Sequence, residues 1–395
     1  MAYVNKIRAG MTPAQYYAAE NRGKVYDIRD AGAYVDGSHD DTQAVQDTIN
    51  EAAANFGGVV LIPDTGSACI INGALVRDMG GSVDPKSQLY IPQKNYTDGD
   101  RYTIEIRGEN VPNCTQSNVL SPVVAPVRGS ILRSTIENNV DDAYIIGTKG
   151  AAANYATNNY NNFAVRNLQI QYTQNASDQN TIGGIDAHNC GGLLVENATI
   201  FPFNESLNVC NQPINSAIGI NLPKVDGEIM SRVKGVSLGG FQSGIKTGDH
   251  GYLEDIGIFG CLNGIEVGQT NLMTTMIKMF TLGCKNQITF SGGLSIVNIL
   301  SLMVENKTQS KWFDYDTTIL DSSNYGRGVV NYSIWIDNAF ANASFVKTGG
   351  SRLRAMPIGF LSGTGFTVTG STDSQKIASL ITILTDLGII ANGTT

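Results

Sequence analysis

The chain has 395 residues, and only 16% of them are charged, against the roughly 25% usual in soluble domains. Its net charge of −8 and pI near 5.0 argue against nucleic acid as a partner, because binding phosphates requires a basic surface. No apolar run reaches the ~18 residues needed to span a bilayer, and the first residues lack the apolar stretch of a secretory signal. We therefore expect neither membrane insertion nor export by that route.

The cysteine and histidine content predicts no metal site and no cofactor. Six cysteines are scattered without a Cys-x-x-Cys pair, and there are three histidines. A zinc site or a disulfide framework would need a closer and more regular spacing. We expect reduced thiols that are mostly buried.

Residues 1–24 are polar and contain a short helical candidate at 12–20. Residues 25–66 then predict a strand, a Gly- and Asp-containing loop, a helix, and a buried strand that ends at Pro63. Asp40 is expected to cap the helix together with Gln43, three residues on. The predicted buried face of the helix is Val45, Ile49, Ala52, Ala53 and Phe56, and Gly57 and Gly58 end it.

An internal repeat occupies the middle of the chain. Residues 237–248 and 257–268 share their Gly and Ile positions at an offset of 20, and a third copy follows at 281–292. A period in the low twenties with short alternating segments predicts a parallel β-solenoid in which each repeat is one coil. One stacked internal row is expected to contain Ile185, Ile220, Ile245, Ile265 and Ile288.

The C-terminal part changes character twice. Residues 314–373 contain strand-like segments in which the repeat is less visible. Residues 374–387 then place Ile377, Leu380, Ile381, Leu384 and Leu387 on one helical face. Such a face needs a partner, either the chain's own coils or copies of the chain.

The stretch 25–66 resembles the opening module of right-handed parallel β-helix proteins of the pectate-lyase-like group. The matching features are Asp36-Gly37, Asp40-Asp41-Thr42, Gly57-Gly58 and Pro63. The resemblance implies an all-β fold, a right-handed parallel β-helix with an N-terminal capping helix and a short C-terminal helix. In this group the helix covers the open end of the solenoid, where an unpaired edge would otherwise attract another chain.

The module is found in secreted polysaccharide-degrading enzymes and in bacteriophage tailspikes, and the missing secretion signal and the low charge favour the phage branch. The resemblance then implies five regions: a virion-attachment segment (1–24), the opening module (25–66), β-helix coils (67–313), a C-terminal β-rich region (314–373), and a C-terminal helix and tail for trimerisation (374–395). The sequence lacks the motif set that galacturonan hydrolases of this group carry on successive coils.

The resulting hypothesis is a homotrimeric virion spike or fibre, assembled in the host cytoplasm and attached to other virion proteins through its N-terminal segment. It binds a bacterial surface glycan, and whether it also hydrolyses that glycan stays open. One alternative is a non-enzymatic structural or decorating fibre on capsid or tail, used for adhesion only. A third hypothesis is a bacterial polysaccharide hydrolase that is intracellular or atypically secreted.

Polar residues that follow the repeated Ile predict a ladder on adjacent coils, because equivalent positions stack ~4.8 Å apart. One interpretation is a solvated face with an exposed Lys246–Glu266 pair. The other is part of a substrate-binding groove. The ladder consists of Asp186, Asn221, Lys246, Glu266 and Thr289.

A second predicted ladder contains Asn189, Asp226, Asp249 and Gln269. Asp226 and Asp249 fall on adjacent coils, where two carboxylates could reach the ~5–9 Å separation of glycoside hydrolysis and act as acid and partner. Both residues could equally cap turns, as Asp often does. Alternative partners are Glu205, Glu228, Glu254 and Asp255, and His188 and His250 lie beside the ladder carboxylates as proton-shuttle candidates.

Overall fold

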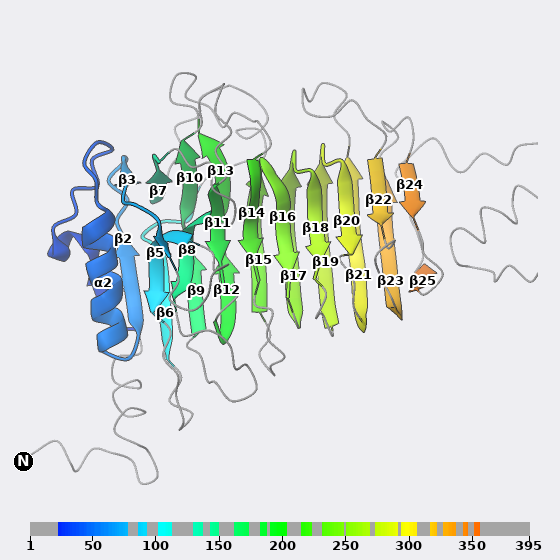
Figure 1. The fold of residues 1–395 in the computed structure, drawn as a ribbon, viewed down its shortest axis with the longest axis horizontal. Coiled ribbons are helices and arrows are strands. Elements are labelled where there is room, and N and C mark those ends of the chain that lie inside the picture. Colours follow the sequence, from blue (N-terminus) through cyan, green and yellow to red (C-terminus); the bar gives the residue numbers. More distant parts are fainter. Residues whose placement is uncertain are drawn as a thin grey trace, which may run out of the picture.

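The computed structural model describes the ranges 23–77, 86–92, 102–112, 129–136, 143–149, 162–173, 182–187, 190–203, 215–222, 231–248, 250–268, 273–290, 294–305, 317–321, 327–336, 343–346 and 351–355. Its elements are mostly short strands that stack along one axis (Figure 1). The predicted C-terminal helix, the 12–20 helix and the 1–24 attachment segment lie outside the described residues, except for residues 23 and 24.

The opening module forms a strand, a single 3-10 turn and a helix. These are β1 (Val25–Asp27), η2 (Ile28–Ala31) and α2 (Thr42–Ala54). Val45, Ile49, Ala52 and Ala53 are buried on one face of α2 as predicted, and Phe56 is half-buried just beyond its end.

The predicted capping pair of Asp40 and Gln43 is absent. The N-cap residue is Asp41, and the Gln43 side chain donates to Asp47 Oδ1 at 2.8 Å. Asp40 instead accepts the Thr42 N–H at 3.0 Å. The two acidic residues have separate tasks, because the buried Asp41 carboxylate accepts the backbone N–H groups of residues 34 and 35.

Two sheets form the body of the molecule. The main path of the first sheet consists of β1, β2 (Gly58–Ile62), β6 (Thr103–Gly108), β9 (Asn162–Arg166), β12 (Gly192–Glu196), β15 (Ser231–Gly239), β17 (Gly251–Phe259), β19 (Met273–Leu282), β21 (Leu294–Glu305), β23 (Arg327–Ile336) and β25 (Ser351–Ala355). Four strands join it beside this path: β3 (Ala68–Ile71), β7 (Ile131–Ser134), β10 (Gln169–Thr173) and β13 (Thr199–Phe203).

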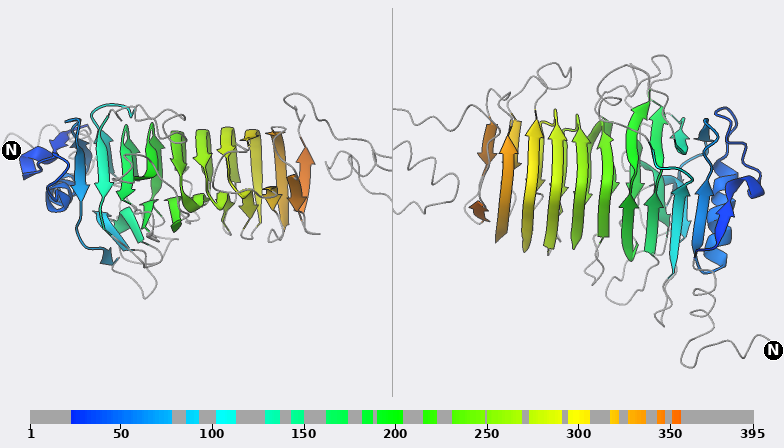
Figure 2. Two further views of the ribbon diagram at one scale, coloured as in Figure 1. Left: turned by 90° about the horizontal axis from the view of Figure 1, so that it is seen from above. Right: turned by 180° about the vertical axis from the view of Figure 1, so that it is seen from behind.

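The second sheet runs alongside the first. Its strands are β4 (Val76–Arg77), β5 (Lys86–Pro92), β8 (Ala143–Lys149), β11 (Ile182–Asp186), β14 (Asn215–Asn221), β16 (Phe241–Thr247), β18 (Asn263–Val267), β20 (Asn286–Phe290), β22 (Thr317–Asp321) and β24 (Ala343–Val346). Between described strands every pairing is parallel except β4 with β5. The fold is a right-handed parallel β-helix, whose coils stack from α2 to β25 in all views (Figure 2).

The predicted row of isoleucines is confirmed. Ile185 pairs in register with Ile220, and the row continues through Ile245, Ile265 and Ile288. All five side chains are fully buried in one core cluster. The repeat therefore records one core position per coil.

Four of the five isoleucines follow a glycine, and that glycine has a steric reason, whereas Ile288 follows Gln287. A Cβ on Gly184 would lie 2.5 Å from the carbonyl oxygen of Gly219, and one on Gly219 would lie 2.6 Å from that of Gly244. The same close approach recurs at Gly244 and Gly264. The Gly-Ile pair is thus a unit in which one residue lets adjacent coils approach and the next fills the interior.

The second feature that recurs from coil to coil is a bend in the first sheet, formed by residues in the left-handed backbone conformation. From β15 onward, single long strands replace the separate pairs β9/β10 and β12/β13, so each long strand must turn a corner in its middle. Residues with positive φ mark that corner: Asn167, Asn197, Gly235, Asp255 and Lys278. Asn and Asp tolerate this conformation better than most residues.

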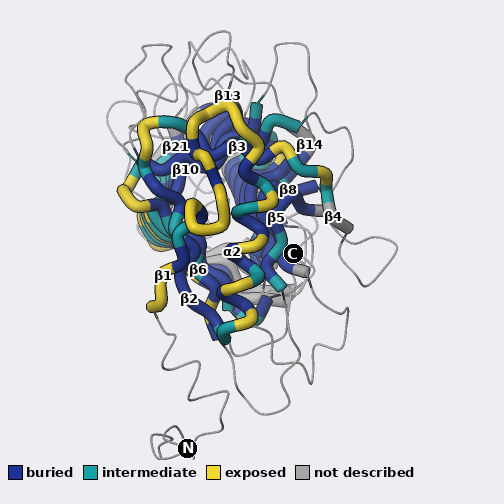
Figure 3. Tube along the Cα trace, turned by 90° about the vertical axis from the view of Figure 1, so that its left-hand side faces the viewer, coloured by how far each residue is buried: buried dark blue, intermediate teal, exposed yellow. Residues whose placement is uncertain are grey.

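The core runs the length of the described coils, and α2 closes one end of it. Figure 3, seen from that end, places α2 in front of the strands with buried residues behind it. The helix packs on β2 and β5, and its buried side chains belong to the same cluster as the strand interiors. No helix within the described ranges is long and apolar enough to cross a membrane.

Candidate functional site

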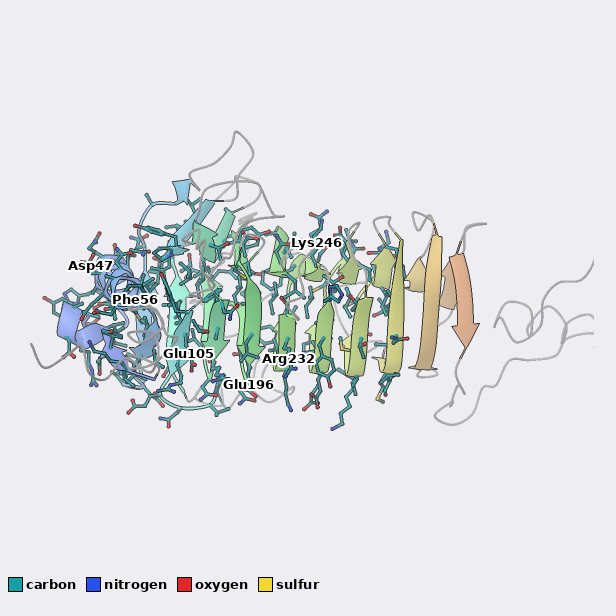
Figure 4. All side chains as sticks on the ribbon, turned by 90° about the horizontal axis from the view of Figure 1, so that it is seen from below. Asp47, Phe56, Glu105, Glu196, Arg232 and Lys246 are labelled. Atoms are coloured by element: carbon teal, nitrogen blue, oxygen red, sulfur yellow. The ribbon has the colours of Figure 1, made fainter. Side chains whose placement is uncertain are left out.

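The outer face of the first sheet carries two polar rungs that cross successive coils. The first rung consists, in register, of Glu105, Ala164, Leu194, Arg232 and Tyr252. The second consists of Arg107, Arg166, Glu196, Lys234 and Glu254. Alternating residues of a strand point to opposite faces, so the side chains of both rungs lie on the outer face of the sheet, away from the core. Figure 4 shows Glu105, Glu196 and Arg232 on that face.

Arg166 joins two carboxylates from different coils. One guanidinium nitrogen, Nη1, lies 3.2 Å from Glu105 Oε2, and Nε lies 3.1 Å from Glu196 Oε2. Arg107 Nη1 lies 3.7 Å from the other oxygen of Glu105. Glu105 is the least exposed member, with 13% of its side chain accessible. Glu105 thus lies between two cationic side chains that come from its own strand and from the next coil.

A cavity of about 440 Å³ opens beside this network, a volume typical of ligand sites. Two small residues contribute to it: Ala164 stands in register with the longer Glu105 and Leu194, and Gly192 has no side chain. We call it the lateral groove, and its lining is Thr103, Glu105, Asn162, Phe163, Ala164, Arg166, Gly192, Leu193, Leu194 and Arg232. The floor is apolar and the walls are charged.

Arg232 stands at the far wall of the lateral groove. It is exposed, and its guanidinium lies 6.0 Å from the ring centroid of Tyr252 on the next coil. None of the described carboxylates lies within ion-pair distance of it. Because this guanidinium is exposed, a ligand can reach it.

The predicted Asp186 ladder exists in register but is less exposed than expected. Lys246 Nζ and Glu266 Oε1 form the anticipated pair at 2.7 Å, and Asn221 Nδ2 donates to Asp186 Oδ1 at 2.7 Å. Asp186 and Asn221 are only 1% and 6% exposed. This ladder belongs to the second sheet, so it does not share the lateral groove.

The predicted catalytic pair lies outside the described residues, as do Glu205 and Glu228. The structure describes two of the alternatives, Glu254 and Asp255. Glu254 belongs to the second rung, with Oε2 3.4 Å from Lys234 Nζ. Asp255 is the exposed corner residue of its coil, with φ 57°. His250 occupies a turn with φ 53°, and His188 is not among the described residues.

The described cysteines are buried thiols, as expected. They are Cys69, Cys190, Cys261 and Cys284. Burial raises the pKa of the Cys69, Cys190 and Cys261 thiols, which makes them poor nucleophiles. Within the described ranges no three His, Cys, Asp or Glu side chains converge as a metal site would require.

Comparison with known proteins adds structural likenesses. No protein-family model matches the chain, and no curated protein matches it. The ORF18 protein of Geobacillus virus E2 is 11% identical with a TM-score of 0.42, and the match covers 85% of this chain and 62% of that one. The chain thus spans less than two thirds of that viral protein.

Two further solved structures show the same kind of likeness. The surface protein and adhesin PfbA of Streptococcus pneumoniae is 13% identical with a TM-score of 0.26, covering 86% of this chain and all of that one. The family 28 exopolygalacturonase of Yersinia enterocolitica is 12% identical with a TM-score of 0.30, covering 86% and 77%. The similar proteins thus include a viral protein, an adhesin and an enzyme, and identities this low leave the comparison at the level of the fold.

Proposed function

We propose that the chain is a bacteriophage virion spike or fibre that binds a bacterial surface polysaccharide in the lateral groove. The observation that carries the proposal is the groove itself, an open cavity with an apolar floor and charged walls on the long side of a solenoid. Such a site combines the apolar contact and the few fixed polar groups typical of ligand sites. The resemblance of residues 25–66 to the tailspike module supports the virion setting.

The experiment is binding of the full chain to an array of bacterial capsule and cell-wall polysaccharides. Wild-type protein is compared with Thr103→Trp, which fills the groove from an exposed position on β6. We expect binding to at least one polymer and its loss in the variant, with the thermal unfolding midpoint unchanged. Equal binding by both proteins would contradict the proposed site. Detection of the chain in purified virions would separate the phage hypothesis from a bacterial hydrolase.

A second candidate is adhesion without catalysis, and one observation favours it. Glu105, the one carboxylate of the described groove lining, is ion-paired to Arg166, as is Glu196, so the described lining does not offer the pair of carboxyl groups that glycoside hydrolysis uses. Depolymerisation by Asp226 and Asp249 is the competing proposal. Release of reducing ends from a bound polymer separates the two.

A further inference from the structure

We infer that the lateral groove selects acidic glycans, whose sugars carry carboxylates, and that Arg232 is the residue that recognises the charge. This inference rests on the proposed function and deepens it.

The charge of the groove lining opposes the charge of the chain. The whole molecule carries −8, whereas the described residues of the lining include one carboxylate, Glu105, and two guanidinium groups, Arg166 and Arg232. Glu105 is already neutralised by Arg166 and faces Arg107 from its other oxygen. The uncompensated charge in the groove is therefore positive.

The two arginines of the lining differ in availability. Arg166 donates a hydrogen bond from Nη1 to Glu105 Oε2 and is also ion-paired to Glu196, so its charge is already compensated within the wall. Arg232 has no carboxylate partner among the described residues, and its guanidinium lies 6.0 Å from the ring centroid of Tyr252. The planar guanidinium is suited to two parallel hydrogen bonds to a carboxylate.

The floor explains how such a ligand reaches Arg232. Ala164 lies between Glu105 and Leu194 on the first rung, and Leu194 separates it from Arg232. Adjacent coils are ~4.8 Å apart, so Ala164 and Leu194 together give a sugar ring an apolar bed two coils wide. A carboxylate on that ring then faces Arg232 at the open side.

The test measures affinity for matched probes. Short oligosaccharides of hyaluronan, alginate and polysialic acid are each paired with their carboxyl-reduced neutral counterparts, alongside neutral dextran. Binding to wild type is compared with Arg232→Gln, with Thr103→Trp as the blocked groove. Lys234→Gln is the control, because it removes an equal charge two residues along the same strand but outside the lining.

We expect an acidic probe to bind at least about tenfold more tightly than its reduced form, since a charge-assisted hydrogen bond is lost. Arg232→Gln removes this preference and Lys234→Gln keeps it. Equal affinity for acidic and neutral probes, with both sensitive to Thr103→Trp, would overturn the inference and leave the proposed function standing. Binding that Thr103→Trp does not alter, or no binding by any probe, would overturn both.

Discussion

Gly244 lies directly against Gly264 on the next coil, so close that a Cβ on Gly244 would stand 2.7 Å from the Gly264 carbonyl oxygen. The contact lies one residue before the buried isoleucines 245 and 265, which pair in register. Glycine is therefore required where the repeat shows it.

Gly244→Ala is expected to lower the free energy of unfolding by about 1–3 kcal/mol, the usual range for overpacking. Equilibrium denaturation measures it. Gly251→Ala is the matched control, because a Cβ there meets its nearest atom at 3.4 Å, an ordinary contact. Equal losses in the two variants would show that chain entropy, and not the close approach, explains the effect.

Removal of Arg166 is expected to destabilise more than removal of Lys234. Arg166→Met leaves Glu105, 13% exposed, without its closest cationic partner, and should cost about 1–3 kcal/mol. Lys234→Met breaks an open pair with Glu254, in which the lysine is 51% exposed, and should cost less than about 1 kcal/mol. Urea unfolding of both variants tests the ranking, which the reverse order would refute.

The opening module is expected to loosen below about pH 4. Backbone N–H groups of His39 and Ser38 hold the pKa of Asp36 well below its ordinary value. Partial burial raises the pKa of Asp40, but hydrogen bonds from Thr42 and Asn72 outweigh it, and the net shift is downward. Both carboxyls bind protons more weakly folded than unfolded, so their stabilisation is present above the unfolded pKa of ~3.9 and is lost as the pH falls further.

Hydrogen exchange of the α2 amides, corrected for intrinsic rates, measures this loss between pH 7 and pH 2. Asp40→Asn should remove part of the pH dependence. Asp30→Asn, at an exposed carboxylate of the same module, should retain it. A helix whose protection is independent of pH in the parent protein would contradict the expectation.

If Asp226 and Asp249 form an acid and its partner, Asp226→Asn or Asp249→Asn should reduce depolymerisation by several orders of magnitude while glycan binding persists. The substitution is nearly isosteric and removes only the ionisable group. Reducing-end release, measured beside thermal unfolding, distinguishes this from turn capping, where stability falls and no specific function is lost. Full activity in either variant eliminates the pair.

Deletion of residues 374–395 is expected to lower the yield or stability of a trimer. The apolar face of this predicted helix requires a partner, and a three-fold symmetric assembly buries that face in all three copies. Sedimentation analysis of the full and shortened chains measures the assembly. A monomer both before and after deletion would contradict trimerisation.

Much of the fold could be predicted from the sequence, because the same residue types recur at equivalent positions of successive coils. The recurring Ile, preceded by Gly on four of the five coils, predicted the parallel strands, since these coils make the same contact with their neighbours. The helical face of Val45, Ile49 and Ala52 was equally readable. The predicted Asp40–Gln43 cap was wrong for two reasons. Gln43 donates to Asp47 instead. The N-cap residue is Asp41, whose carboxylate accepts the backbone N–H groups of residues 34 and 35.

The lateral groove escaped prediction because its residues belong to early coils whose spacing is irregular. Glu105, Arg166 and Glu196 come from strands 61 and 30 residues apart, and no visible period aligns them. Only the register of β6, β9 and β12 brings them together.

By itself, then, the amino-acid order determined the parallel coil, its buried isoleucine row and the helix that closes it, because these depend on local period and side-chain size. The tertiary structure decided which polar residues share a surface. Which residues align depends on the number of residues in each loop between the strands. A longer loop changes the spacing of the aligned residues in the sequence but leaves the strands stacked in the same way.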